Sequence, residues 1–197
     1  MQKKEIQEQR IKGYFMEAAK EMLKGEGLKS ISVRNIAERA GYSYTTLYNY
    51  FKDLNELIFL CVKDFQNECE SFIGDETRKT PRGTEKIKAI TKAYINYFVQ
   101  YPGIFELCFI EKISNIDSKQ PITELIATFP DRLCQTEWEY CINEKICSKE
   151  EADIKMKQLR FSVTGMLLLY LNRMQPTDYK EFISTADGQL DEILNKR

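Results

Sequence analysis

Five polar side chains between residues 44 and 49 could together read a nucleic acid. They are Tyr44, Thr45, Thr46, Tyr48 and Asn49. All five donate or accept hydrogen bonds, and none carries a negative charge. Base edges and phosphate oxygens are recognised by side chains of these types. A helix that presented this stretch outward could therefore lie in the major groove of DNA.

Two short apolar patterns predict the helices that would hold this stretch. Val33, Ile36, Ala37 and Ala40 follow one another at i, i+3, i+4 and i+7, which is one face of a first helix. Leu47, Tyr50 and Phe51 form the expected buried stripe of a second helix. The polar residues then remain on the outer face of this second helix.

Residues that start and stop helices frame both patterns. Ser32 and Ser43 each stand where a hydroxyl can cap a helix N-terminus, and Gly41 suits the left-handed stop between them. Helices this short, joined by so few residues, bury their apolar faces by crossing steeply, which describes a helix-turn-helix. Periodicity alone is explained equally well by an ordinary helical hairpin with a polar outer face.

The N-terminal third of the chain resembles the DNA-binding domain of the TetR/AcrR transcriptional regulators. The resemblance runs without a gap from Ala18 to Leu57. It is carried by Ala18-Ala19, Met22-Leu23, Gly27, Ser32–Ala37, Ala40-Gly41, Leu47-Tyr48 and Tyr50-Phe51. It implies a regulator, expected to be a repressor, that binds a double-stranded DNA operator as a homodimer and responds to an unknown small-molecule effector.

Given this resemblance, we assign roles within the helix-turn-helix. The side chains expected in the groove are Arg34, Tyr44, Thr45 and Thr46, and those expected on phosphates are Ser32, Tyr48 and Lys52. The chain departs from the family at Leu54, where many members carry a lysine that contacts a phosphate, and at Thr45, where many carry glycine. The first departure keeps open a TetR-like co-activator or adaptor that binds a protein partner instead of DNA.

Composition narrows the class of protein. The chain has 197 residues and no histidine, which excludes a Ser-His-Asp triad, a Cys-His dyad and His-containing zinc sites. We therefore expect no enzyme, no cofactor and no metal. Residues 1–52 hold ten lysines and arginines against six glutamates, whereas residues 53–197 hold nineteen basic against twenty-four acidic side chains. A basic N-terminal part on an acidic remainder fits DNA binding by the former.

The hydrophobic pattern predicts an all-α fold with about nine helices. We expect helices over residues 4–25, 33–40, 44–51, 53–73, 84–100, 104–113, 122–147, 148–174 and from 176 onward, with loops over 74–83 and 114–120. The expected domains are residues 1–52 for DNA binding and 53–197 for effector binding and dimerisation. No signal peptide or long apolar run is visible, so the protein is expected in the cytoplasm and not in a membrane.

The resemblance also implies an effector pocket and a dimer interface in the second domain. Candidate pocket residues are Phe59, Phe98, Phe105, Phe109, Trp138, Phe161 and Met166. Candidate interface residues on the last two helices are Leu159, Val163, Leu167, Tyr170, Leu171, Phe182, Leu190, Ile193 and Leu194. For each of these side chains, ordinary core packing is the alternative.

Overall fold

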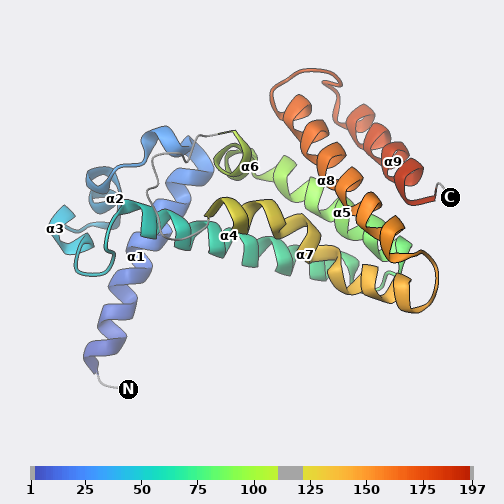
Figure 1. Ribbon diagram of the computed structural model, residues 1–197. Helices are drawn as coiled ribbons and strands as arrows, with labels where there is room; N and C mark the ends of the chain where they lie inside the picture. Colours follow the sequence, from blue (N-terminus) through green and yellow to red (C-terminus); the bar gives the residue numbers. More distant parts are fainter. Residues whose placement is uncertain (1–2, 111–121, 196–197) are drawn as a thin grey trace. The chain divides into compact units, whose positions relative to one another are not determined.

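The computed structural model describes residues 3–110 and 122–195, and every regular element in these two ranges is a helix (Figure 1). The elements are α1 (Lys3–Glu26), the 3-10 turn η1 (Leu28–Ser30), α2 (Val33–Ala40), α3 (Tyr44–Leu47), α4 (Leu54–Thr77), α5 (Thr84–Gln100), α6 (Pro102–Phe109), α7 (Ile122–Asn143), α8 (Lys149–Leu171) and α9 (Tyr179–Asn195). The all-α prediction is confirmed. No helix in the described ranges is both long enough and apolar enough to cross a bilayer.

The helices pack into two compact units. The head unit comprises residues 1–67 and 101–126, and the body unit comprises residues 68–100 and 127–197. Helices α4 and α7 each contribute residues to both units. The expected boundary between residues 52 and 53 thus falls inside the head unit, and the two functional domains remain a proposal.

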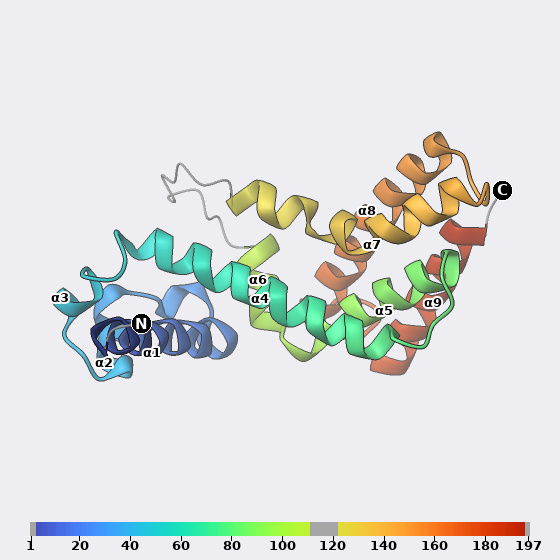
Figure 2. The same ribbon diagram turned by 90° about the horizontal axis from the view of Figure 1, so that it is seen from below.

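An aromatic cluster forms the centre of the head unit. Phe15 of α1 is fully buried, and its ring lies 5.5 Å from Tyr42, 6.2 Å from Tyr50 and 6.3 Å from Phe51, measured between ring centroids. Figure 2 shows α2 lying against α1 in this unit. Burial of large apolar rings is the main source of stability in so small a core.

Helix α6 approaches the end of α1 so closely that a glycine is needed at the contact. A Cβ atom on Gly103 would lie 2.7 Å from the carbonyl oxygen of Lys24 and 2.9 Å from that of Leu23. Such distances are far below van der Waals contact, and both neighbouring atoms belong to the backbone. Gly103 therefore sets how near α6 and α1 can pack.

The body unit is held by an antiparallel pair, α8 and α9, that packs on α5 (Figure 1). The rings of Tyr170 and Phe182 stack with centroids 4.1 Å apart and join α8 to α9. Ion pairs join α5 to α9: Lys92 lies 2.8 Å and Lys88 lies 2.7 Å from the carboxylates of Asp187 and Asp191, respectively. These partly exposed pairs add about 1 kcal/mol or less each, so apolar contact decides the packing.

Several helix ends differ from the prediction. Helix α4 continues through Gly74 to Thr77, because Gly74 is exposed in an ordinary helical conformation and nothing there ends the helix. The expected loop over 74–83 is correspondingly shorter. The recognition helix α3 ends at Leu47, so Tyr50 and Phe51 lie in the following turn even though Phe51 is buried as expected.

The later helices are also shorter or displaced relative to the prediction. Helix α6 begins at Pro102, α7 ends at Asn143 and α8 ends at Leu171. Helix α9 begins at Tyr179 and not at Pro176, because the Asp178 carboxylate accepts hydrogen bonds from the first backbone N–H groups of the helix. Helix α6 ends at Phe109, short of the expected end at residue 113, and the expected loop over 114–120 lies outside the described residues.

Candidate functional site

Capping residues define the start of α2, its end and the start of α3. The Ser32 hydroxyl accepts a hydrogen bond from the backbone N–H of Asn35 at 3.1 Å, and the Ser43 hydroxyl accepts one from Thr46 at 3.2 Å. Gly41 has φ of +78°, the left-handed conformation expected for the helix stop. Each cap stabilises its helix by about 1 kcal/mol. The three predicted cap positions are therefore confirmed.

Packing between α1, α2 and α3 fixes how α3 is presented. Ile36, Ala37 and Leu47 are buried where the two short helices cross, and Ala37 leaves no room for a larger side chain. Arg39 on the outer side of α2 pairs with Glu21 at 3.3 Å and Glu26 at 2.9 Å, both on α1. The small buried residue and the cross-links to α1 hold α3 at the surface of the head unit.

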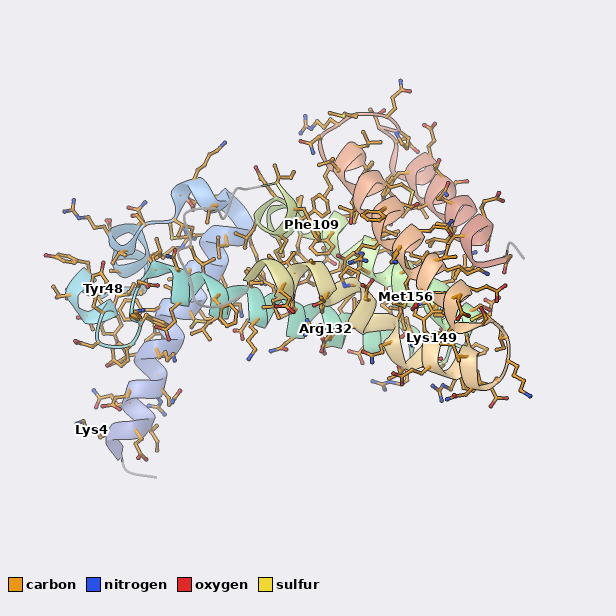
Figure 3. All side chains as sticks on the ribbon, viewed as in Figure 1. Lys4, Tyr48, Phe109, Arg132, Lys149 and Met156 are labelled. Atoms are coloured by element: carbon orange, nitrogen blue, oxygen red, sulfur yellow. The ribbon has the colours of Figure 1, made fainter. Side chains whose placement is uncertain are left out.

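The predicted DNA-contacting side chains lie on this surface. Tyr44 and Tyr48 are each 53% exposed, and Tyr48 is labelled at the surface of the head unit in Figure 3. Arg34, Thr45 and Lys52 are exposed as well, whereas Ser32 and Thr46 are half-buried. Two exposed tyrosines on a helix of four residues leave apolar rings in water, which is typical of a surface that binds a partner.

Three hydroxyl groups form a cluster at the start of α3. The Ser43 Oγ lies 2.7 Å from the Thr45 Oγ1 and 2.8 Å from the Thr46 Oγ1. These contacts limit the rotamers of both threonines before any ligand binds, so less side-chain entropy is lost on binding. The sequence indicated Ser43 only as a cap, because the contact to Thr45 depends on rotamers that spacing does not reveal.

The first turn of α4 holds Lys52 in a defined place. The backbone N–H of Lys52 donates to the Glu56 carboxylate at 2.6 Å, while the backbone N–H of Glu56 donates to Asp53 at 2.8 Å. Asp53 and Glu56 thus form a reciprocal cap at the start of α4, with Lys52 as the residue that Glu56 reaches. The Lys52 side chain stays exposed next to Leu54, the position where relatives often carry the phosphate-binding lysine.

The predicted effector-binding residues are spread over both units. Phe59, Phe105 and Phe109 belong to the head unit, where the last two rings lie 4.8 Å apart. The other four belong to the body unit: Phe98 and Trp138 are buried, Met166 is half-buried, and Phe161 is 71% exposed on α8. Of the seven, only Trp138 lines the cavity described next.

The body unit contains a cavity of about 30 Å³, which we call the body cavity. Helices α5, α7 and α8 line it with Ile90, Thr91, Tyr94, Pro130, Asp131, Leu133, Cys134, Trp138, Met156, Leu159, Arg160, Val163 and Thr164. Sequence reasoning missed the polar pair in this wall, Asp131 and Arg160, because the two residues are far apart in the chain and lie on different helices.

The polar pair is held inside an otherwise apolar wall. Arg160 Nη1 lies 3.4 Å from the Asp131 carboxylate and donates to the carbonyl oxygen of Ala127 at 3.5 Å. Burial raises the pKa of Asp131 above its ordinary value, and Arg160 partly counters the shift. Burial also raises the pKa of the Cys134 thiol to about 12, so this side chain is neutral at physiological pH.

The predicted dimer-interface residues pack inside a single chain. Leu159, Val163, Leu167, Phe182, Leu190, Ile193 and Leu194 are buried, and Tyr170 stacks on Phe182. These side chains contribute to the core of the body unit and Leu171 is half-buried, so a role of the nine residues in dimerisation stays a prediction. Helix α8 also carries four large apolar side chains that are exposed to solvent: Ile154, Phe161, Leu168 and Leu169.

No cluster of three or more cysteine, aspartate or glutamate side chains suited to a metal ion occurs in the part of the chain that the structure describes. The six cysteines are free thiols, and four of them are buried.

Comparison with known proteins identifies the head unit. Residues 15–60 match the family model described as bacterial regulatory proteins, tetR family. This range begins in α1, includes α2 and α3, and ends in the first turns of α4, so it contains all seven residues that we assigned to DNA.

Solved structures share the fold over almost the whole chain. FadR from Bacillus subtilis in complex with stearoyl-CoA is 14% identical, with 92% of this chain and 96% of that chain covered and a TM-score of 0.71. A TetR family transcription regulator from Marinobacter aquaeolei is 14% identical, with coverage of 96% and 98% and a TM-score of 0.67. AibR in complex with isovaleryl coenzyme A and operator DNA is 12% identical, with coverage of 95% and 100% and a TM-score of 0.63.

At these identities, the likeness to solved structures establishes a common fold, and the family match establishes the type of DNA-binding domain. The predicted resemblance is confirmed by both. Residues 15–60 are thus a helix-turn-helix domain of the type found in bacterial regulatory proteins of the tetR family, and the chain as a whole shares the fold of solved transcriptional regulators.

Proposed function

We propose that the protein is a cytoplasmic repressor that binds a palindromic operator as a homodimer and leaves it when a small molecule binds the body unit. The observation that carries the proposal is the exposed face of α3, where Tyr44 and Tyr48 are each 53% exposed. No acidic residue occurs between Arg39 and Lys52 to repel phosphates. This face provides hydrogen-bonding groups for base edges and a nearby cation for the backbone.

Binding of a full operator requires two heads. One helix-turn-helix reads about half a site, and dimers place two recognition helices on successive major grooves. We propose that the dimer surface consists of three exposed apolar residues on α8, namely Ile154, Phe161 and Leu168. They are spaced seven positions apart and therefore lie on one side of the helix. Phe161, with 71% of its surface exposed, is the central residue.

The dimer proposal has a direct test. Phe161→Ala should raise the dimer dissociation constant about tenfold or more, as expected for an exposed aromatic residue that becomes central in an interface. Tyr179→Ala is the matched control, because Tyr179 is also a large exposed aromatic residue of the body unit. Sedimentation equilibrium measures both variants, and equal dissociation constants would exclude this surface.

The small-molecule part of the proposal is supported by two relatives that were solved with coenzyme A thioesters, FadR with stearoyl-CoA and AibR with isovaleryl coenzyme A. In this chain, we assign the effector group to the body cavity, because helices α5, α7 and α8 line it mostly with apolar side chains. Helices α4 and α7 contribute residues to both units, so a ligand that changes their packing in the body can favour another state of the head. Acyl-CoA thioesters are the first compounds to test.

The experiment is an electrophoretic shift of the purified full chain with fragments that flank its own coding sequence. We expect a specific complex at a palindromic site and its loss on addition of an effector. A ligand that binds the body unit but leaves operator affinity unchanged would contradict the mechanism. A folded dimer that binds none of the fragments specifically would favour the adaptor that holds a protein partner.

A further inference from the structure

We infer that the body cavity binds a ligand that carries an uncharged hydrogen-bond acceptor, such as the carbonyl of a ketone, ester or thioester, on a narrow apolar chain. The inference rests on the proposed effector-binding role of the body unit and specifies the chemistry of that ligand. It follows from the unsatisfied donors, the charge and the size of the cavity.

Two buried N–H groups of the cavity wall have no acceptor. The Nε1 of Trp138 and the Nε of Arg160 are both inaccessible to water, and neither has a hydrogen-bond partner among the described residues. Trp138 as a whole is only 3% exposed. Buried donors in folded proteins are almost always paired, so two unpaired donors in the wall of one cavity indicate a missing acceptor.

The charge of the wall favours a neutral acceptor. Among the residues that line the cavity, only Asp131 and Arg160 carry charges, and they pair with each other at 3.4 Å. A ligand carboxylate would compete with Asp131 for Arg160, and a ligand ammonium group would be repelled by Arg160. Moving either ion out of water carries a large desolvation cost, whereas a neutral carbonyl oxygen can accept a hydrogen bond from a free donor without disturbing the pair.

The size and the remaining wall favour a narrow apolar chain. A cavity of about 30 Å³ holds one small group, such as a carbonyl with an adjacent methylene. Most of the other lining side chains are apolar and come from α5, α7 and α8, as Met156 on α8 illustrates (Figure 3). A longer chain must therefore widen the space between these helices, and this gives the ligand a way to change the packing of α7.

The test uses four probes of equal length that differ in one group. They are 2-hexanone, hexanoate, hexylammonium and hexane. Trp138 is the only tryptophan of the chain, so its fluorescence reports directly on the cavity. We expect 2-hexanone to change the emission of the full-length protein and to raise its melting temperature, with at least tenfold weaker binding of the other three probes.

Variants separate the two donors from general packing. Trp138→Phe keeps an aromatic ring without the N–H, and Arg160→Lys keeps the cation beside Asp131 without the Nε donor. Each should weaken the binding of 2-hexanone about threefold to tenfold, as expected for the loss of one hydrogen bond. Arg132→Lys is the matched control, because Arg132 is exposed on α7 and does not line the cavity. Ligand-induced shifts in melting temperature compare all three variants.

Three results would overturn the inference. Tighter binding of hexanoate than of 2-hexanone would show an anion site. Equal binding of hexane and 2-hexanone would show a purely apolar cavity without a role for the donors. If the folded protein binds none of the probes, the body cavity is a packing defect and not a ligand site. Operator binding is measured separately on the ligand-free protein. If the protein binds its operator but none of the probes, the cavity inference is wrong and the proposed DNA-binding function is not.

Discussion

The helix-turn-helix and the body cavity differ in how completely their polar groups are satisfied. In the head unit, the Ser32 and Ser43 hydroxyls cap their helices and the Ser43 hydroxyl also positions two threonines. In the body unit, Trp138 and Arg160 keep unpaired donors next to unfilled space. Both regions are packed from helices, yet the body cavity is the one of the two with buried donors that lack an acceptor among the described residues.

This difference indicates two modes of recognition. A surface whose side chains are already oriented binds with little reorganisation, which suits a rigid partner such as a DNA groove. An interior with unpaired donors and free volume is stabilised by whatever fills it, which suits a ligand that shifts a conformational equilibrium. The following variants test this contrast, beginning with the largest expected effect.

Truncation of a leucine should cost more in the filled core than at the cavity wall. Leu47, the last residue of α3, is fully buried in the head unit, whereas Leu159 lines the body cavity. Leu47→Ala should lower the free energy of unfolding by about 3–5 kcal/mol and abolish DNA binding. Leu159→Ala should cost about 2–3 kcal/mol, because a side chain beside a void has fewer packing partners to lose, and it should retain DNA binding.

Urea unfolding and operator titration measure both leucine variants. Equal losses of stability would show that the body cavity is filled as tightly as the core of the head. Loss of DNA binding in Leu159→Ala alone would contradict the assignment of the DNA surface to the head unit.

Two glycines provide a second contrast, between a close contact and an open helix surface. Gly103→Ala should destabilise the protein by about 1–3 kcal/mol, because the new methyl group would meet backbone oxygens at 2.7 and 2.9 Å. Gly74→Ala, at an exposed position in the last turn of α4 with no atom within 4 Å, should stabilise it by about 0.5–1 kcal/mol. Thermal melts that rank the two variants in the opposite order would contradict the packing of α6 on α1.

Two conservative changes on α3 should affect DNA binding in different ways. Tyr48→Phe removes one proposed phosphate contact and should weaken binding to all sequences alike, by about threefold to tenfold. Thr46→Ala removes a proposed groove contact and should instead change the order of preferred sequences. Titration against a panel of variant sites measures both effects, and unchanged binding by both variants would remove these roles.

The smallest expected effect concerns the pH dependence of the body unit. Because burial raises the pKa of Asp131, the folded protein retains this proton at pH values where the unfolded chain has lost it. The contribution of Asp131 to stability therefore increases as the pH falls from neutral through the raised pKa, and is largest below the ordinary value of about 4.

Comparison with Asp131→Asn, which does not titrate, isolates this contribution. Between pH 7 and about pH 4, the unmodified protein should gain stability relative to the variant in urea unfolding. A relative loss on acidification would show that Arg160 lowers the pKa of Asp131 more than burial raises it.

Local patterns predicted the head unit well. Ser32, Gly41 and Ser43 occupy the expected cap positions, and α8 begins after Ser148, close to the expected start at residue 148. These features depend on residues within a few positions of one another. Helix ends were less predictable, as Gly74 shows, because an exposed glycine continues a helix when its neighbours favour it.

Features that depend on distant residues could not be predicted. The pairing of Asp131 with Arg160 and the free donor of Trp138 result from the packing of α7 on α8, which no local spacing encodes. The apolar stripe of α8 likewise predicted burial without revealing which side faces the core. Val163 is buried there, whereas Phe161, two residues earlier, is exposed.

The most direct test of DNA reading by the head unit is the salt dependence of operator affinity. Each head presents Arg34 and Lys52 as exposed cations on the proposed surface, so a dimer would bring about four charges to the phosphates. The logarithm of the association constant should then fall with the logarithm of salt concentration with a slope of about −3 to −4 between about 50 and 200 mM salt. A slope near zero, or no specific complex from a folded dimer, would contradict the account.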